Sequence, residues 1–358
     1  MKCVMLNKKY RIRSSVALSY NNGKMEFFKT NTREIVILQM QNVIDFLKQF
    51  NGERTLYEIS RNSLFNEKSL ENFIKFLHDR NILIEVDSNY DAYLYSSKYR
   101  LINFLEDYCF STSEVLQVLE NLALKSVLIV GLGGVGSWVA DILARSGVGS
   151  FILIDSDKVE LSNLHRQDFY IEKDIGRFKI DCVEERLLEI ADIRVTKYYQ
   201  ILNEAFFENF NEDFCLAINC ADFPSVDKTT EIIGKECMRR RIPHVIGGGY
   251  NLHLSLIGQS ILPYESACYN CFDEALKEIN DIQENMIKKL VRKDRKVGSF
   301  TPLCSLSASL TAIEAFKLLC GFNNKLTNTN HRIEFKIKTM DIERKRILRN
   351  PKCKVCGN

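Results

Sequence analysis

The sequence predicts an α/β protein in which a mostly parallel sheet, covered by helices, follows a small α+β domain and precedes a metal-bound tail. Three observations predict this class. Strand and helix patterns alternate from Lys125 onward, the strand patterns are almost entirely apolar, and two Cys-x-x-Cys pairs stand in the last third of the chain. Apolar strands that alternate with helices are typical of a parallel sheet buried on both faces.

The chain is expected to form two domains, residues 1–95 and residues 96–358. The first part has few glycines and many Lys, Asn and aromatic residues, whereas the second soon reaches a strand, a glycine-rich turn and a helix. A single core usually stops growing near 250–300 residues, so a chain of 358 residues has room for two cores.

The first domain shows the order of a small winged-helix module. A short helix is predicted in 55–61, a longer one over 67–80 and a returning strand in 81–87, whereas 34–47 is too densely apolar to show one period. The longer helix places Leu70, Phe73, Ile74 and Leu77 on one face. Over roughly residues 30–90 this order resembles the precursor-peptide recognition domain of enzymes that modify ribosomal peptides. The alternative is a domain that serves packing or dimerisation alone.

Composition and charge exclude several classes of function. The net charge of +3 gives no global basic field of the kind that nucleic-acid binding uses. The N-terminus lacks the features of a secretory signal, and no run approaches the roughly 18 apolar residues that span a bilayer. We therefore expect a cytoplasmic protein with no nucleic-acid or membrane partner, whose twelve cysteines are reduced thiols or metal ligands.

The second domain is predicted to alternate strands with helices in chain order. The strands are expected in 126–130, 150–157, 194–199, 216–222 and 244–250, and the helices in 137–148 and 177–191. The polar stretch 274–296 interrupts this order and is interpreted as an excursion or a solvated helix rather than a nucleic-acid patch.

A glycine-rich turn follows the first strand of this domain and precedes its first helix. Gly131, Gly133, Gly134 and Gly136 leave the backbone N–H groups free to approach a phosphate or ribose, and the helix N-terminus favours negative charge. By itself the turn indicates only a nucleotide, most often a dinucleotide.

The residues after the second strand favour ATP over a redox cofactor. Asp155 stands about 20 residues beyond the glycines, as suits a contact with ribose hydroxyls. Activation of a carboxylate by ATP develops negative charge on the α-phosphate and on pyrophosphate, which Arg, Lys and a metal ion stabilise. Arg166, Gln167 and Lys179 are of the right types, whereas a hydride-transferring enzyme has no leaving phosphate to hold.

The segments GLGGVGS, IDSDKVELSNLHRQ, IGRFKID and CADFP resemble those of the ThiF/MoeB superfamily, adenylating enzymes related to ubiquitin-activating enzymes, over roughly residues 110–358. The resemblance implies a Rossmann-like adenylation domain that binds ATP and Mg²⁺. It implies that Asp155 binds the ribose, with Asp157 beside it at the nucleotide. It also implies triphosphate contacts from Asn163 and Arg166, supported by Gln167. Lys179 would contact a phosphate, and Asp222 would be the magnesium-linked carboxylate. The plainer alternatives are strand-end caps at Asp155 or Asp157 and a solvated helix residue at Lys179.

The resemblance also implies a homodimer in which an arginine before the catalytic domain enters the partner's active site. Arg100 is the nearest candidate, although its spacing departs from the usual arrangement and Lys98 could serve instead.

The two Cys-x-x-Cys pairs are predicted to hold a structural zinc ion. Cys268 with Cys271, and Cys353 with Cys356, can present four thiolates tetrahedrally and close the site. A redox disulfide is the alternative. Cys304 precedes a predicted helix, where a lowered thiol pKa would permit a nucleophilic role, but a small core residue is the plainer interpretation.

The domain ahead of the adenylation domain favours a peptide substrate. The combination resembles members that act on short ribosomal peptides in microcin C and pantocin biosynthesis, which implies activation of a peptide carboxylate or amide and then cyclisation or dehydration within the peptide. The alternatives are activation of a ubiquitin-like sulfur carrier and a non-catalytic nucleotide-binding module. No general base is identified, and His165 is interpreted as a packed or exposed side chain. Candidate peptide contacts are Tyr250, Asn251, Arg292, Lys293 and Arg295.

Overall fold

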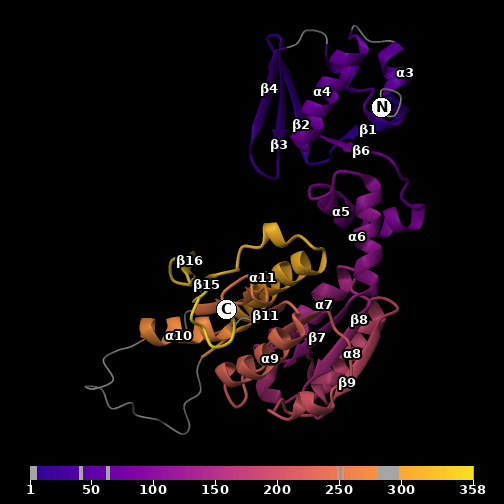
Figure 1. The fold of residues 1–358 in the computed structure, drawn as a ribbon. Helices are drawn as coiled ribbons and strands as arrows, with labels where there is room; N and C mark the ends of the chain where they lie inside the picture. Colours follow the sequence, from indigo (N-terminus) through magenta and orange to yellow (C-terminus); the bar gives the residue numbers. More distant parts are fainter. Residues whose placement is uncertain are drawn as a thin grey trace. The chain divides into compact units, whose positions relative to one another are not determined.

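A computed structural model of the chain shows two compact units, Met1–Glu120 and Asn121–Asn358 (Figure 1). The residues that the structure describes are 6–39, 43–61, 65–247, 250–251, 254–280 and 298–357.

The first unit extends beyond the boundary that we placed at residue 95. Helix α5 (Ala92–Glu106) belongs to this unit because its last residue, Glu106, forms an ion pair with Arg11 and accepts a hydrogen bond from the hydroxyl of Tyr90 at 2.9 Å. The buried guanidinium of Arg13 also donates to the Cys109 carbonyl oxygen at 2.8 Å. These polar contacts tie the segment after residue 95 to the N-terminal strands.

The first unit contains two small antiparallel sheets and several helices. One sheet has the order β2-β3-β4, formed by β2 (Val16–Asn21), β3 (Lys24–Lys29) and β4 (Ile35–Gln39). The other has the order β5-β1-β6, formed by β1 (Lys9–Ile12), β5 (Asn51–Thr55) and β6 (Leu83–Glu85). The helices are α2 (Ile44–Leu47), α3 (Leu56–Arg61), α4 (Glu67–Asp79), α5 and α6 (Thr112–Leu124), the last of which crosses the boundary between the units.

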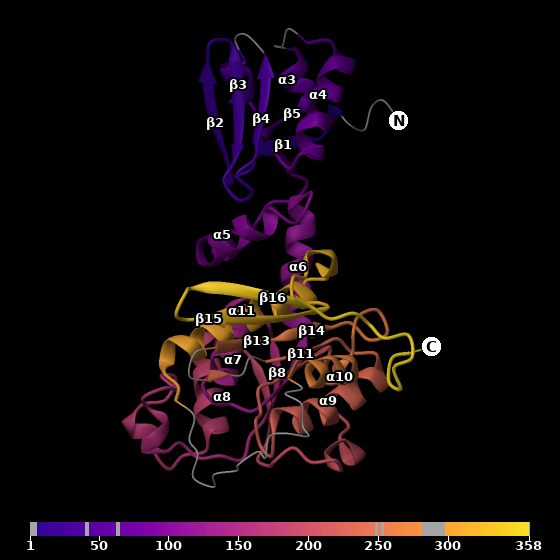
Figure 2. The same cartoon turned by 90° about the vertical axis from the view of Figure 1, so that its left-hand side faces the viewer.

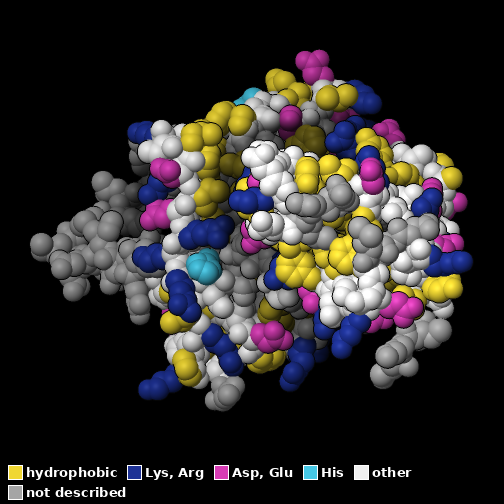
Figure 3. Space-filling view, turned by 90° about the horizontal axis from the view of Figure 1, so that it is seen from above, with side chains coloured by type: hydrophobic (Ala, Val, Ile, Leu, Met, Phe, Trp, Pro, Cys, Tyr) yellow, Lys and Arg dark blue, Asp and Glu magenta, His cyan; other side chains and the backbone are white. Residues whose placement is uncertain are grey.

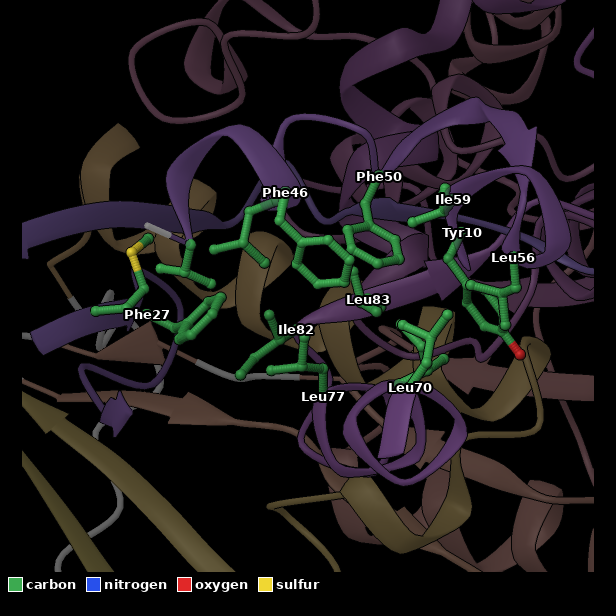
Figure 4. Packing of buried hydrophobic residues seen from close by; sticks show 14 of the residues in the cluster. Tyr10, Phe27, Phe46, Phe50, Leu56, Ile59, Leu70, Leu77, Ile82 and Leu83 are labelled. Atoms are coloured by element: carbon green, nitrogen blue, oxygen red, sulfur yellow. The ribbon is translucent and has the colours of Figure 1, made fainter. Parts of the chain in front are cut away.

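Helix α4 packs its apolar face into the core of the first unit, as Figure 4 shows. Leu70, Ile74 and Leu77 are completely buried on this face, and Phe73 packs against the same cluster. The helix begins after Asn66, whose side-chain oxygen accepts a hydrogen bond from the Ser69 N–H and satisfies one of the unpaired donors of the first turn. The predicted helical face is confirmed.

The second unit is built on a six-stranded sheet of order β14-β11-β10-β7-β8-β9. Its strands are β7 (Ser126–Val130), β8 (Ser150–Ile154), β9 (Arg194–Tyr198), β10 (Leu216–Asn219), β11 (His244–Ile246) and β14 (Gln259–Ile261). The first five run parallel, and β14 pairs antiparallel with β11. This arrangement confirms the mostly parallel sheet.

Helices cover both faces of this sheet. They are α7 (Gly136–Arg145), α8 (Lys179–Ile190), α9 (Val226–Arg240), α10 (Tyr269–Asn280) and α11 (Thr301–Leu319). Helix α7 packs against both α8 and α11, whereas α9 packs against α10 (Figure 2). Because β8 and β10 lie on opposite sides of β7, right-handed crossovers place α8 and α9 on opposite faces.

A second sheet of order β12-β13-β15-β16 completes this unit. Its strands are β12 (Tyr250–Asn251), β13 (Leu254–Ile257), β15 (His331–Lys336) and β16 (Asp341–Arg346). Single 3-10 turns occur at Leu161–Asn163, Glu172–Asp174, Phe206–Asn209 and Asn323–Lys325.

Helix α11 is a core helix of the second unit. Among the described residues it alone is long and apolar enough to cross a membrane, but 56% of its apolar stretch is buried within the fold. It packs against α7 and β13, and its buried Glu314 accepts a hydrogen bond from Ser260 at 3.0 Å. Its apolar length is therefore explained by burial in the fold.

The buried His244 should make the protein less stable in mild acid. Burial lowers the pKa of this side chain to about 4, from 6.5, because the charged imidazolium loses its hydration. Between these values the unfolded chain binds a proton that the folded chain does not, so the free energy of unfolding should decrease as pH falls from 6.5 towards 4, by up to roughly 3 kcal/mol. Urea unfolding at a series of pH values measures this slope.

The variant His244→Asn should lose most of the slope between pH 6.5 and 5, while His165→Asn, which changes an exposed side chain, should keep it. An unchanged slope in His244→Asn would contradict this assignment.

Candidate functional site

The glycine turn follows β7 at the point where the strand order of the sheet reverses. Strand β7 lies between β8 and β10, and ligands of such sheets bind at the carboxyl ends of the strands on either side of this point. Gly131 has φ +85°, and a Cβ there would lie 2.7 Å from the Ala221 nitrogen. A Cβ at Gly136 would lie 1.9 Å from the Gly131 oxygen. Both positions therefore require glycine.

Asp155 follows β8 and holds the glycine turn directly. Its carboxylate accepts a hydrogen bond from the Leu132 N–H at 2.6 Å and another from the Asp157 N–H at 2.7 Å. Burial raises the pKa of Asp155, and these two N–H groups oppose that increase. The carboxylate is thus fixed at the edge where the turn begins, which suits a ribose contact as well as the capping interpretation.

Lys179 is the first residue of α8 and forms an ion pair with Asp157. The distance from Lys179 Nζ to Asp157 Oδ2 is 2.9 Å, and only 5% of the lysine is exposed. This burial contradicts the interpretation of Lys179 as a solvated helix residue. Asp157 orients the ammonium group at the carboxyl edge of the sheet, next to Asp155.

The segment that follows Glu160 folds back against the glycine turn. The side-chain oxygen of Asn163 accepts a hydrogen bond from the Glu160 N–H at 3.0 Å. Gln167 is buried, and its Nε2 lies 3.6 Å from the Cβ position of Gly133. Its Oε1 has no hydrogen-bond partner within the described part of the chain. A buried amide oxygen without a partner beside the turn fits a ligand that donates a hydrogen bond.

Arg166 has a partly accessible side chain beside the same turn. Its Nη1 donates to the Ser162 carbonyl oxygen at 2.5 Å, and its own carbonyl oxygen lies 3.1 Å from the Cβ position of Gly134. The guanidinium can therefore exchange a backbone partner for an anionic ligand.

Asp222 is exposed in the loop that follows β10. Asn219, the last residue of that strand, fixes the loop, since its Oδ1 accepts from the Ala221 N–H at 3.1 Å and its Nδ2 donates to Thr229 at 3.0 Å. The backbone of Ala221 is also the part of the loop that approaches Gly131. Asp222 therefore directly follows the residue that approaches the glycine turn, and its magnesium-linked role stays a prediction.

Two contacts at the turn carry no signal in the sequence. The hydroxyl of Tyr170 donates to the Leu132 carbonyl oxygen at 2.5 Å and is buried. Trp138, the only tryptophan of the chain, donates from Nε1 to Asp168 at 2.6 Å. Both pairs lie far apart in the sequence, and their partners are recognisable only once the fold is known.

Cys304 lies inside α11, whose first residue is Thr301, rather than ahead of the helix. Its side chain is completely buried, and its sulfur lies 3.0 Å from the Cβ position of Gly134. The thiol therefore packs against the glycine turn as a small core residue. This burial does not suit a nucleophile that must meet a substrate.

The remaining candidates lie in the first unit or beyond the described side chains. Arg100 is an exposed residue of α5 that donates to the Tyr99 hydroxyl at 3.1 Å, and its role in a partner's active site stays a prediction. Lys98 has non-helical backbone angles within the same helix. The candidate peptide contacts that fall outside the described side chains are Tyr250, Asn251, Arg292, Lys293 and Arg295.

The four predicted zinc ligands come together in one buried cluster. All four sulfurs lie within 4.8 Å of one another. Cys268 and Cys353 are 3.6 Å apart, and Cys271 and Cys356 are 3.5 Å apart. Four thiolates around a tetrahedral zinc ion at about 2.3 Å stand about 3.8 Å from each other, so this cluster fits zinc.

The fold and the site define a nucleotide-dependent enzyme of the adenylating class. A glycine turn, a fixed carboxylate, a buried lysine, a partly exposed arginine and an exposed aspartate follow strands of one parallel sheet at its carboxyl edge. The ThiF family model matches residues 106–355, and the chain belongs to the ThiF family.

Relatives in sequence are named adenylyltransferases. The molybdopterin-synthase adenylyltransferase of Escherichia coli is 28% identical over 241 residues, which is 66% of this chain and 89% of that protein. The sulfur carrier protein ThiS adenylyltransferase of the same species is 32% identical over 200 residues, which is 55% of this chain and 73% of that protein. The protein is therefore an enzyme of the adenylyltransferase type, and these names support the use of ATP.

Solved structures with the same fold include those of MccB and PaaA. E. coli MccB, solved with MccA-N7isoASN, has a TM-score of 0.79 at 22% identity and covers 98% of this chain and 99% of its own. PaaA has a TM-score of 0.70 at 21% identity and covers 94% of this chain and 100% of its own. At these identities the likeness shows the fold, which extends over both units.

We expect the purified protein to hold about one zinc ion per chain through its four cysteines. The double variant Cys353→Ser, Cys356→Ser should lose the metal, because two thiolates do not close a tetrahedral site. Elemental analysis after gel filtration measures the content. The control Cys320→Ser, on a cysteine outside the cluster, should keep it; retention of zinc by the double variant would contradict the assignment.

Proposed function

We propose that this protein activates a carboxylate or amide of a short ribosomal precursor peptide by adenylation, in the biosynthesis of a peptide antibiotic. Cyclisation or dehydration within the peptide then follows. The observation that carries the proposal is the combination of the adenylating site with a separate N-terminal unit. The adenylyltransferase relative of molybdopterin synthase matches only 66% of the chain, whereas the fold shared with MccB covers both units.

The adenylation step needs an oxygen nucleophile, an electrophilic phosphorus and stabilisation of the leaving group. A carboxylate oxygen of the peptide attacks the α-phosphorus of ATP, an oxygen–phosphorus bond forms, and the bond to the β-phosphate oxygen breaks. Pyrophosphate leaves with the electron pair. A nucleophile of the peptide then attacks the activated carbonyl carbon and releases AMP. The enzyme contributes positioning and charge stabilisation.

The residues of the site are of the types that this positioning and charge stabilisation require. Asp155 would bind the ribose, and Gln167 would accept a hydrogen bond from the nucleotide. Arg166 and Lys179 would stabilise the charge that develops on the phosphates. Asp222 would hold Mg²⁺, which would neutralise the departing pyrophosphate.

The N-terminal unit supports a peptide partner. Strand β4 ends the sheet of order β2-β3-β4 and leaves Ile35 and Ile37 about half exposed, at 55% and 54%. An edge strand has backbone groups available to pair with an extended peptide, and neighbouring apolar side chains add affinity. Figure 3 looks onto a face where hydrophobic side chains gather in patches among Lys and Arg side chains.

Activation of a sulfur-carrier protein is the second candidate, and the names of the relatives in sequence favour it. Incubation with ATP, Mg²⁺ and either a short peptide encoded beside this gene or a sulfur carrier separates the two. We expect pyrophosphate release and a mass change with the peptide; release with the carrier alone would overturn the peptide assignment.

Removal of the charges at the site should abolish adenylation without unfolding the protein. Asp222→Ala and Lys179→Met should each lower the rate of pyrophosphate release at least about 100-fold, because the charge on the leaving group is no longer balanced. Binding of a fluorescent ATP analogue measures nucleotide affinity in the same samples. The exposed controls Asp213→Ala and Lys173→Met should behave like the parent chain, and full activity in either site variant would exclude its role.

A charge on the β4 edge should weaken peptide binding selectively. Ile37→Glu should raise the KM for the peptide at least about tenfold, since an apolar contact is replaced by a carboxylate, and should leave nucleotide binding unchanged. Ser19→Glu on β2, the opposite edge of the same sheet, is the matched control. An equal effect of the two variants would contradict capture at β4.

A further inference from the structure

A cavity of about 780 Å³ lies in the second unit, and its lining includes no residue of the glycine turn 131–136. Its walls come from the first turns of α9, from α10, from the ends of β11 and β14, from β15 and from the C-terminal tail. Helices α9 and α10 lie side by side here (Figures 1 and 2).

The cavity adjoins the loop that carries Asp222. Gly247 lines it at the end of β11 and donates its N–H to the Asn219 oxygen at 2.6 Å. Ser225 lines it at the start of α9, where its hydroxyl caps the helix by accepting from the Lys228 N–H at 3.2 Å. The Asp222 loop therefore begins and ends at residues that line or contact the cavity. A group held in the cavity stands next to the proposed centre of adenylation.

Part of the cavity wall is apolar and closely packed. Gly234 of α9 allows the ring of Tyr269 to approach, because a Cβ there would lie 2.3 Å from Tyr269 Cδ1. Phe272 and Ile333 are each only 2% exposed. The apolar lining consists of Val226, Ile246, Tyr269, Phe272, Ile333 and Val355. Leu276 of α10 adds to this lining.

One wall carries a positive charge that is not neutralised. Lys354 lies between the ligands Cys353 and Cys356, is exposed, and forms no ion pair within the described ranges. The other cations of the lining are compensated: Lys228 and Lys235 pair with Glu231 at 3.2 and 2.6 Å, and Arg332 pairs with Glu334 at 2.5 Å. The acidic residues Asp227 and Asp273 lie on the helix walls, in α9 and α10, so a carboxylate in the cavity is attracted towards the tail.

We propose that this cavity binds the residues next to the activated carboxyl group and selects an apolar side chain beside an acidic one. This inference rests on the proposed function, in which the acceptor of AMP is a peptide. It also gives the cysteine-bound tail a second role, since the tail supplies one wall of the substrate site.

Two labelled tripeptides test the charge preference. Dansyl-Leu-Glu-Gly should bind the full-length protein roughly tenfold more tightly than dansyl-Leu-Lys-Gly, as measured by fluorescence anisotropy without ATP. Lys354→Glu should remove or invert this preference. Lys352→Glu, a charge reversal on an exposed lysine two residues away that does not line the cavity, should preserve it. Equal binding of the two peptides, or an unchanged preference in Lys354→Glu, overturns the inference.

Filling the cavity tests its location. Leu276→Trp should weaken binding of both tripeptides at least about tenfold and leave the affinity for a fluorescent ATP analogue unchanged. Leu188→Trp, on an exposed position of α8, should change neither. Undiminished tripeptide binding in Leu276→Trp overturns the inference.

The two proposals fail in different experiments. The proposed function is wrong if no peptide causes pyrophosphate release, regardless of how tightly the tripeptides bind. The cavity inference is wrong if adenylation is active and its KM for the peptide is the same in Lys354→Glu, Leu276→Trp and their controls.

Discussion

A Cβ on Gly131 would lie 2.7 Å from the Ala221 nitrogen, so β7 and β10 can end side by side only with glycine at this position. The positive φ of Gly131 turns the chain there, and its N–H donates to the Ile154 oxygen at the end of β8. The ends of three strands are thereby gathered at one edge. Asp155 after β8 and Asp222 after β10 reach the same small region because their strands flank β7. The negative charges of these two carboxylates are brought to the same edge of the sheet by this close approach of the strands.

Local periodicity carried most of what the sequence could predict. Helix α4 and the strands of the parallel sheet are long or apolar enough for one pattern to dominate, and they lie where they were expected. Periodicity gave no assignment for residues 34–47, because this one apolar run contains two elements with different periods, the strand β4 and the helix α2. The pair Asn22-Gly23 between β2 and β3 is a hairpin signal that could have been used, since both residues have positive φ.

Contacts between distant segments account for what the sequence did not reveal. The first unit runs to Glu120 because Arg11, near its start, pairs with the buried carboxylate of Glu106, and no local pattern records that pairing. The same holds for Tyr170, whose hydroxyl meets a backbone oxygen 38 residues earlier. Residue type predicted the chemistry of Lys179 but not its burial, which depends on the position of Asp157. For Cys304 the sequence position suggested a chemical role, because the residue stands near a helix start. The structure instead packs its thiol against Gly134, as part of the core.

The cysteine-bound tail shows why a metal site can be predicted while its purpose cannot. Spacing alone indicated four thiolates, yet the ligands Cys268 and Cys353 are 85 residues apart, and closing such a loop costs conformational entropy. Bonds from the thiolates to a metal ion would offset that cost. The turn between Cys353 and Cys356 is also held by a hydrogen bond, because the Val355 N–H donates to the Cys353 sulfur at 3.4 Å. Lys354 and Val355 line the cavity from this short turn, so a metal ion held by the four thiolates would also stabilise that wall of the cavity.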